Sequence, residues 1–249
     1  MQKIKWTRSS TVSSNFSKSK KLSRVSIAAL TLAVVTIGPS AEAISSQSGS
    51  GKTDSVIVLS QTTAASALAK LPVKGRAPKT GYTRDLFSDG WGDIGSCDTR
   101  NYILSRDLTK IVWRSGETCI VDSGVLRDPY TGATINFKRG VSSSLKVQID
   151  HVVAVSDAWQ KGAQKISGAQ RYSFYNDPLN LLAVDGPTNS SKGDSDAASW
   201  LPPNKSFRCA YVARQVAVKR KYSLWVTAAE KDAISRVLGT CPKYLLPTK

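Results

Sequence analysis

The chain has 249 residues, of which 41% are hydrophobic and 21% are charged. This composition excludes a disordered chain and a protein with many membrane spans, and it allows one large core or two small domains. Basic residues number 35 against 18 acidic ones, which gives a formal net charge of +17. The only histidine, His151, excludes His-rich zinc sites and must serve any mechanism that uses an imidazole.

The N-terminus, residues 1–43, has the pattern of a secretory signal peptide. Residues 1–24 contain seven basic residues and no acid, residues 25–37 are an uncharged apolar run, and Ala41-Glu42-Ala43 is a typical cleavage site. The apolar run is short for a membrane span, and an uncleaved signal anchor is the alternative. Cleavage leaves 28 basic and 17 acidic side chains. We expect a secreted, extracellular protein, not inserted in a membrane, that is attracted to nucleic acid or to anionic wall polymers.

Residues 44–69 are rich in Ser, Gly and Gln and predict a flexible linker, which places the folded domain over residues 70–249. Residues 70–84 contain five basic residues and no acid, with prolines and glycines that interrupt any helix. We expect this segment to be an extended arm. It is either a solvated tail or a segment that contacts phosphates.

The first half of the domain predicts a short helix and then strands. Asp98 caps the predicted helix over residues 99–108. Strands are predicted over residues 110–113, 118–122 and 133–138, the last one after an Asp-Pro-Tyr-Thr-Gly turn.

The second half predicts two buried strands, over residues 145–154 and 179–184, with a helix over residues 156–163 between them. Two helices follow, over residues 208–222 and from Thr227 to Gly239, and Lys219, Arg220 and Lys221 are expected to be a solvated helix end. No repeat and no regular βαβ succession is visible. The sequence predicts a mixed α+β chain.

Four cysteines in an exported chain predict two disulfides. Cys209 begins the first C-terminal helix and Cys241 follows the second. Two antiparallel helices bring the start of the first beside the end of the second, so we pair Cys209 with Cys241. Cys97 then pairs with Cys119.

Polar residues that suit a reactive site are concentrated between residues 148 and 205. Asp150 and His151 lie side by side in an apolar strand, where polar groups need partners. Asn180 stands near the start of the second apolar strand. Asn189 and Lys192 follow one turn apart on a predicted helix, for which Asp185 is the candidate cap.

This layout resembles the HNH endonuclease superfamily, whose ββα core holds one divalent metal. The segments CDTRNYILSRDL, DPYTGATINF, QIDHVVAVSDAWQKGA, YNDPLNLLAVDGPTNSSKGDSDAASWLPPN and RCAYVARQVAVKRKY are similar to secreted bacterial HNH nucleases. They are also similar to the C-terminal nuclease domain of restriction enzymes that attack modified DNA. The resemblance covers about residues 70–245. It implies a ββα core over about residues 145–200 within a helix-rich single α+β domain stapled by disulfides.

The resemblance also implies a role for each residue. His151 would be the general base that takes a proton from the attacking water. Asp150 and Asn189 would hold Mg²⁺ or Mn²⁺, because asparagine at the third HNH position suits a hard cation. Asn180 would orient the connection between the strands. Phosphates would be contacted by Lys192, Arg171 and Arg100.

One geometric condition comes with this assignment. Neighbouring side chains of a regular strand point to opposite faces, so Asp150 and His151 can share a site only at a strand end or a bulge.

Three other classes are weighed against the nuclease. A non-catalytic, secreted polyanion-binding module is the main alternative, although Asp150, His151 and Asn189 are all present. A Ser-His-Asp hydrolase would need a G-x-S-x-G elbow, which the sequence lacks. A membrane-surface protein would need a basic amphipathic helix. We therefore expect a monomeric, metal-dependent endonuclease that cleaves DNA, or RNA, with little sequence specificity.

Overall fold

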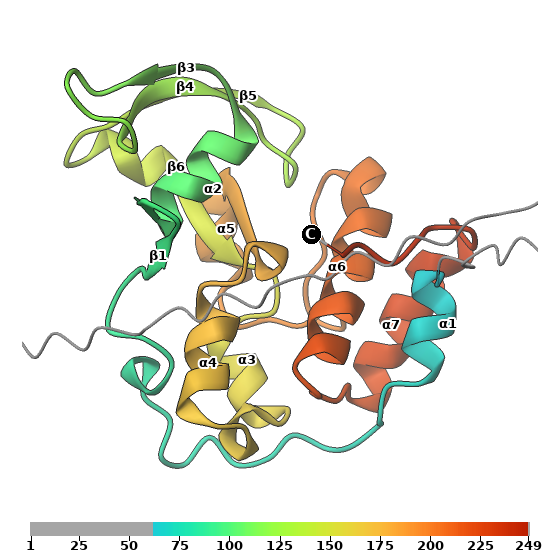
Figure 1. Cartoon of the computed structure of the whole chain (residues 1–249). Coiled ribbons are helices and arrows are strands. Elements are labelled where there is room, and N and C mark those ends of the chain that lie inside the picture. The colour runs from blue at the N-terminus through green and yellow to red at the C-terminus, as the bar shows by residue number, and fades with distance from the viewer. Residues whose placement is uncertain (1–61, 249) are drawn as a thin grey trace, which may run out of the picture. The chain divides into compact units, whose positions relative to one another are not determined.

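Helices and short strands alternate along residues 62–248, the part of the chain that this computed structural model describes (Figure 1). The predicted signal peptide and most of the predicted linker lie outside these residues. The helices are α1 (Ala64–Ala69), α2 (Thr99–Asp107), α3 (Val155–Gln160), α4 (Gly168–Tyr175), α5 (Gly186–Lys192), α6 (Arg208–Lys221) and α7 (Ala228–Gly239). The strands are β1 (Asp93–Ile94), β2 (Cys97–Asp98), β3 (Leu108–Trp113), β4 (Val121–Arg127), β5 (Thr134–Lys138), β6 (Val147–His151) and β7 (Leu181–Asp185). The predicted α+β class is confirmed.

A three-stranded antiparallel sheet, in the order β3-β4-β5, lies at the top of Figure 1. The strands predicted over residues 110–113 and 133–138 overlap β3 and β5. The strand predicted over residues 118–122 is wrong in position, since β4 begins at Val121 and continues to Arg127. In the middle of β4, a Cβ atom on Gly124 would lie 2.7 Å from the Leu108 Cδ2 atom. Glycine usually weakens a strand, but Gly124 allows β3 and β4 to pack closely.

The predicted ββα unit is formed by β6, β7 and α5. β6 and β7 are antiparallel, and His151, the last residue of β6, pairs with Leu181, the first of β7. Asp185 caps α5, as predicted, by accepting a backbone hydrogen bond from the first turn. Gly186 then begins the helix at a point where a Cβ atom would lie 1.9 Å from the Leu145 carbonyl oxygen. Only glycine fits this junction between strand and helix.

Two helices lie in the chain between β6 and β7, and only the first of them, α3, is predicted from the sequence. The second, α4, begins with a capping box in which Ser167 and Gln170 satisfy each other's backbone N–H groups. This local signal is present in the sequence and could have identified the helix.

The two-stranded β6–β7 sheet is buried on both faces. Leu182 and Val184 pack on one side in a hydrophobic cluster with residues of α1, α6 and α7. Ile149 and Leu181 pack on the other side with residues of α2 and of the β3-β4-β5 sheet. Burial on both faces explains why β7 is apolar from Leu181 to Val184 rather than alternating. β6, by contrast, carries the polar residues Gln148, Asp150 and His151.

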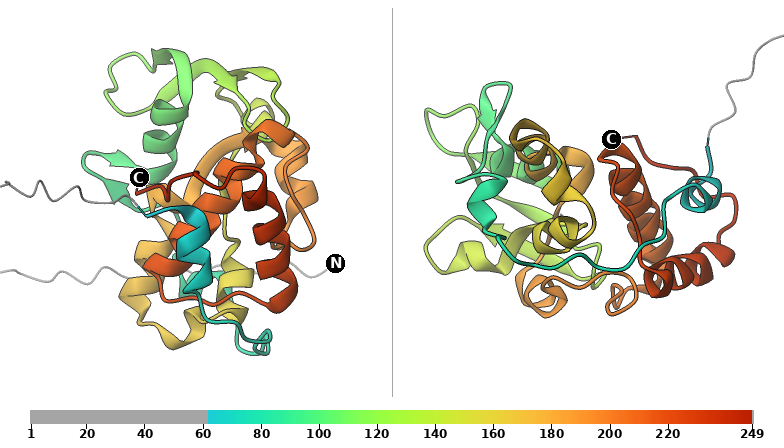
Figure 2. Two further views of the ribbon diagram at one scale, coloured as in Figure 1. Left: turned by 90° about the vertical axis from the view of Figure 1, so that its right-hand side faces the viewer. Right: turned by 90° about the horizontal axis from the view of Figure 1, so that it is seen from below.

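The domain boundary predicted at residue 70 is wrong, because α1 lies before it. Thr63 caps this helix, and Ala64, Ala67 and Leu68 are buried in the cluster shared with α6 and α7 (Figure 2). A six-residue helix of mostly small side chains has no broad apolar stripe, so its sequence resembles a linker. Its stability comes from tertiary packing.

The arm predicted over residues 70–84 is extended, as expected, and it is attached to the domain. Val73 forms an isolated parallel bridge with Val226. The Trp225 indole N–H donates to the Gly75 carbonyl oxygen at 3.0 Å, and the Ala77 N–H donates to the carbonyl oxygen of α3 residue Gln160 at 2.9 Å. The prediction of a free, solvated tail is therefore wrong.

Both predicted disulfides are present, Cys97 to Cys119 and Cys209 to Cys241. The second bond joins the first turn of α6 to the residues after α7, as expected for an antiparallel helix pair. The capping box of Thr227 and Glu230 that predicts the start of α7 is also present. In the chain-entropy model each disulfide contributes about 3–4 kcal/mol to stability.

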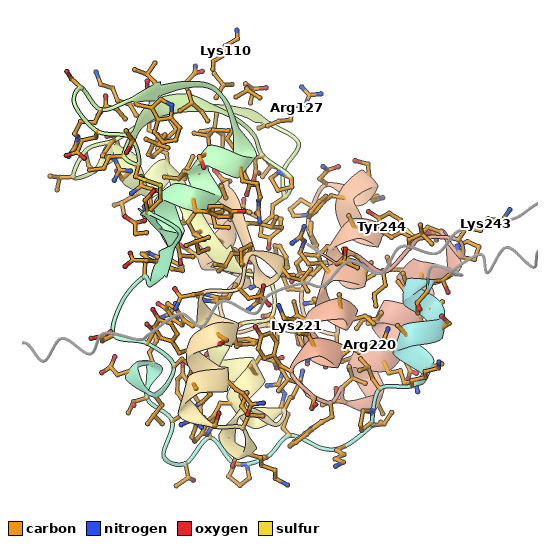
Figure 3. All side chains as sticks on the ribbon, in the orientation of Figure 1. Lys110, Arg127, Arg220, Lys221, Lys243 and Tyr244 are labelled. Carbon is orange, nitrogen blue, oxygen red and sulfur yellow. A yellow bond between two sulfur atoms is a disulfide. The ribbon has the colours of Figure 1, made fainter. Side chains whose placement is uncertain are left out.

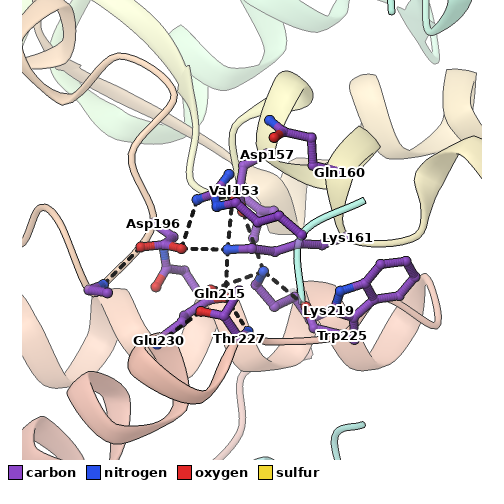
Figure 4. A network of polar contacts seen from close by, with 12 residues as sticks. Val153, Asp157, Gln160, Lys161, Asp196, Gln215, Lys219, Trp225, Thr227 and Glu230 are labelled. Carbon is purple, nitrogen blue, oxygen red and sulfur yellow. Dashed lines mark hydrogen bonds and ion pairs between the residues drawn. The ribbon is translucent and has the colours of Figure 1, made fainter. Parts of the chain in front are cut away.

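A group of charged side chains, all buried except Arg76, joins the arm to α3, α6 and α7 (Figure 4). Its members, which we call the ion cluster, are Arg76, Asp157, Lys161, Asp196, Lys219 and Glu230. Three cations and three carboxylates balance each other, as buried charges require. Lys219 is fully buried in this cluster, so the prediction that it belongs to a solvated helix end is wrong.

The ion cluster predicts a pH dependence of stability. Burial alone would raise the pKa of Asp196, but the Lys161 ammonium and the Arg76 charge outweigh burial and lower this pKa. Such a carboxylate stabilises the fold above its unfolded-state pKa, and the stabilisation is lost as the pH falls toward the folded-state pKa. We expect the free energy of unfolding to decrease below about pH 4, and to decrease less steeply in Asp196→Asn. Urea unfolding over a pH series measures both slopes, and equal slopes would contradict the prediction.

Candidate active site

The side chains of Asp150 and His151 lie on opposite faces of the two-stranded sheet formed by β6 and β7. Asp150 pairs with Leu182 of β7 and contacts Lys192 of α5. His151 lies on the other face, against Trp91. His151 ends β6, so the dipeptide does sit at a strand end, but this position does not bring the two side chains together. The two side chains for which a single site is predicted therefore lie on opposite sides of the β6–β7 sheet.

His151 is held in one tautomer. Its Nε2 atom lies 2.8 Å from the Tyr175 carbonyl oxygen, which can only accept a hydrogen bond. Nε2 therefore carries the hydrogen and Nδ1 carries the lone pair, and Nδ1 has no hydrogen-bond partner among the described residues. Burial, followed by the positive charge of Arg84, lowers the pKa of His151 to about 3. The imidazole is neutral at neutral pH, with its lone pair on Nδ1.

Aromatic rings fix the plane of this imidazole. Trp91 stacks on it with ring centres 5.7 Å apart and an interplanar angle of 11°. The Tyr175 ring centre lies 4.5 Å away, and the Phe174 ring centre lies 6.5 Å away. His151 is only 4% exposed, while Trp91 is half-buried and forms the outer wall of the site.

The Asp150 carboxylate has a partner at each oxygen. Oδ1 accepts a hydrogen bond from Lys192 Nζ at 2.9 Å, and Oδ2 accepts one from the Tyr130 hydroxyl at 2.5 Å. Burial raises the pKa of Asp150, although the Lys192 charge opposes this shift. Lys192 also donates to the His151 carbonyl oxygen at 2.9 Å. Lys192 thus joins the Asp150 side chain to the backbone of His151.

Asn180 makes the kind of positioning contact that its predicted role requires. Its amide oxygen accepts from the Val153 N–H at 2.9 Å, and its amide nitrogen donates to the Val153 carbonyl oxygen at 3.3 Å. Its own carbonyl oxygen accepts from the Val152 N–H. Asn180 therefore holds the chain that leaves β6 directly after His151.

The residues predicted to hold Mg²⁺ or Mn²⁺ do not fit a divalent metal in this arrangement. Both oxygens of Asp150 are bonded, one of them to an ammonium that carries the positive charge a metal would bring. Asn189 donates from its amide nitrogen to the Gln148 side chain at 2.9 Å, and its amide oxygen, the atom that would bind a metal, has no partner among the described residues. Within residues 62–248 no group of three or more His, Cys, Asp or Glu side chains could hold a metal ion. We derive no reaction step through a metal.

The basic residues predicted to contact phosphates have other contacts. Lys192 is fully buried and paired with Asp150, so it can reach a phosphate only if it leaves this position, and its contact with phosphate stays a prediction. Arg171 donates to the carbonyl oxygens of Leu86 and Ile166, and Arg100 donates to that of Val147. Arg171 and Arg100 therefore brace the backbone, and their contact with phosphates stays a prediction.

Three aromatic residues of the site are not predicted from the sequence. Tyr130 belongs to the Asp-Pro-Tyr-Thr-Gly turn, whose sequence gives no sign of a partner 20 residues later. Tyr175 contributes its backbone carbonyl, which any residue could supply. Trp91 lies 60 residues before the histidine on which it stacks. Only the tertiary fold brings these three to Asp150 and His151.

Comparison with known proteins identifies a family for this chain. Residues 98–237 match the family described as the C-terminal domain of GmrSD restriction endonucleases. This chain belongs to that family. The chain is also 40% identical, over 184 residues, to an uncharacterized secreted protein of Arthroderma benhamiae, which covers 73% of this chain and 86% of the relative. No solved structure matches the chain at a comparable level of significance.

The family match relates this chain to a domain of restriction endonucleases. The matched range contains every residue predicted for the site, from Arg100 to Lys192, and begins after Trp91. The sequence resembles bacterial proteins, but the Arthroderma relative is from a fungus. Among the described residues, no helix has the length and apolar character needed to span a membrane.

The contacts of Lys192 in this GmrSD-family domain predict a large effect on stability. Replacing Lys192 with Met removes the ammonium and leaves the buried Asp150 charge without its partner. Removing one partner of a buried ion pair costs about 3–5 kcal/mol of stability. Urea unfolding of Lys192→Met and of the double variant Asp150→Asn/Lys192→Met measures this cost. We expect the double variant to recover part of the loss, and a single variant as stable as the wild type would contradict the arrangement.

The same contacts predict weak metal binding by the substrate-free domain. Mg²⁺ or Mn²⁺ can reach Asp150 only if Lys192 moves away. We expect either ion to raise the melting temperature no more than NaCl of equal ionic strength does. A saturable increase that disappears in Asn189→Ala would show instead that Asn189 binds metal as predicted from the sequence.

Proposed function

We propose that the protein is a secreted endonuclease that hydrolyses phosphodiester bonds in nucleic acid, with DNA as the first substrate to test. The observation that carries the proposal is the neutral imidazole of His151, which is fixed by the Tyr175 carbonyl oxygen and has a free lone pair on Nδ1. Membership in a family of restriction endonuclease domains supports the same chemistry. The secreted relative supports export, and the signal peptide remains a prediction.

In the proposed reaction, His151 is the general base. Nδ1 takes a proton from a water molecule as the water oxygen bonds to phosphorus. One of the bridging P–O bonds breaks, and the leaving oxygen takes up a proton from solvent. The bond from Nε2 to the Tyr175 carbonyl oxygen strengthens as the ring becomes positive, because a charged donor makes a stronger hydrogen bond.

The residues around His151 orient it in this proposal. Asn180 holds the backbone on one side of the strand end, and Lys192 holds the His151 carbonyl oxygen. Trp91 and Tyr175 restrict rotation of the ring. None of these residues exchanges a proton in the reaction, so their effect is to keep Nδ1 aimed at one point.

Substrate binding is expected to be largely electrostatic. After signal cleavage, the chain carries 28 basic and 17 acidic residues. Such an excess attracts any polyphosphate backbone, and its effect weakens as salt rises. We therefore propose weak sequence preference and action as a monomer.

The decisive experiment is a cleavage assay with the purified protein on supercoiled plasmid, single-stranded DNA and RNA, in EDTA, Mg²⁺ or Mn²⁺. We expect cleavage by the wild type and a loss of about 10²–10⁴-fold in His151→Ala, because a general base contributes a factor of that size. Lys110→Ala, which removes an exposed side chain of β3, should keep full activity.

Melting temperature and DNA affinity of the His151→Ala variant show whether the loss is chemical. Unchanged values with lost cleavage support the general base. Binding of DNA by the wild type without cleavage in any of the three solutions would favour the non-catalytic polyanion-binding module.

A further inference from the structure

Arg84 presents an unpaired positive charge beside Tyr175 and His151. It is the last residue of the extended arm and the first of a short 3-10 turn, Arg84–Leu86, and its side chain is exposed. Its Nε–H donates to the Tyr175 hydroxyl at 3.2 Å, and its guanidinium carbon lies 5.1 Å from the centre of the Tyr175 ring. No carboxylate of residues 62–248 lies within ion-pair distance of this guanidinium.

Tyr175 connects Arg84 with the proposed base. Its hydroxyl accepts from Arg84, its ring lies 4.5 Å from the His151 ring, and its carbonyl oxygen holds His151 Nε2. One residue therefore fixes the guanidinium and the imidazole in relation to each other. The charge of Arg84 is also felt at the imidazole, where it lowers the pKa of His151.

Other cations around the site already use their donors. Lys192 is buried between Asp150 and the His151 backbone. The guanidinium groups of Arg106 and Arg214 donate to carbonyl oxygens of the Pro178–Leu181 segment. A guanidinium has five N–H donors, and among the described residues Arg84 has only two tyrosine hydroxyls near it, that of Tyr175, to which Nε donates, and that of Tyr82. Its two terminal amino groups remain for an anion.

We propose that Arg84 binds the phosphodiester group that His151-activated water attacks. This inference rests on the proposed function. A guanidinium matches the two non-bridging oxygens of a phosphate and stabilises the charge that develops on them in the transition state. Arg84 transfers no proton. The basic arm is thus a segment that contacts phosphate, and it completes the site from outside the range that matches the restriction endonuclease family.

The test compares Arg84→Gln with Arg127→Gln in single-turnover cleavage at saturating enzyme. Arg127 is also an exposed arginine, it lies at the end of β4 far from the arm, and its replacement changes the net charge equally (Figure 3). We expect Arg84→Gln to lose about 10²–10³-fold in rate, as for the loss of one transition-state donor. Arg127→Gln should retain the wild-type rate. Arg84→Lys should fall between them, because an ammonium keeps the charge without the planar fork.

The outcomes separate this inference from the proposed function. If Arg84→Gln cleaves as fast as Arg127→Gln while His151→Ala is inactive, the phosphate contact is overturned and the nuclease stands. If Arg84→Gln loses its rate only because its melting temperature falls with it, Arg84→Lys will be equally unstable and the contact is also overturned.

A binding measurement tests the contact without cleavage. The Nε–Hε signal of Arg84 in ¹⁵N NMR spectra is identified by its absence from Arg84→Gln. We expect this signal to shift when thymidine 3′,5′-bisphosphate is added, and the Arg127 signal to stay in place. A stationary Arg84 signal would overturn the proposal even if the wild type cleaves no nucleic acid.

Discussion

The alternation of side chains along β6 determines the arrangement of the whole site. Because β6 is buried on both faces, each of its residues is committed to one of two packed environments. Asp150 is turned toward α5, where a buried carboxylate needs a cation, and Lys192 supplies it. His151 is turned toward Trp91 and Tyr175, where a buried imidazole is stable only when neutral. The structural and the reactive groups are thus adjacent in sequence and separate in space.

Charge compensation inside the domain determines what its surface can attract. Asp150 and Lys192 balance each other, and the ion cluster of three cations and three carboxylates is also neutral. Neither group contributes to the net charge of the chain. The excess of basic over acidic residues therefore belongs to side chains outside these two groups. Such an excess attracts polyanions.

Local sequence signals predict the fold well where one segment decides the structure. The capping box at Thr227, the cap at Asp185 and the cysteine pairing all hold. The same reasoning fails where distant segments decide. α1 packs against α6 and α7, and Lys219, the first residue of a basic run, is buried because it pairs with carboxylates of the ion cluster. The residue types at Asp150, His151 and Asn180 indicate the site. The spacing of residues in the sequence predicts neither the stacking of Trp91 on His151 nor the bond from Lys192 to Asp150.

The arm extends the active unit beyond the segment that carries the family likeness. Trp91 and Arg84 both precede residue 98, where the family match begins. The arm is fixed at several points before it reaches Arg84, through Gly75, Arg76 and Ala77, and Phe87 is buried in the core directly after it. A segment anchored on both sides has little freedom to carry its guanidinium away from Tyr175. The ion cluster that stabilises the fold therefore also anchors the arm, since Arg76 belongs to both the cluster and the arm.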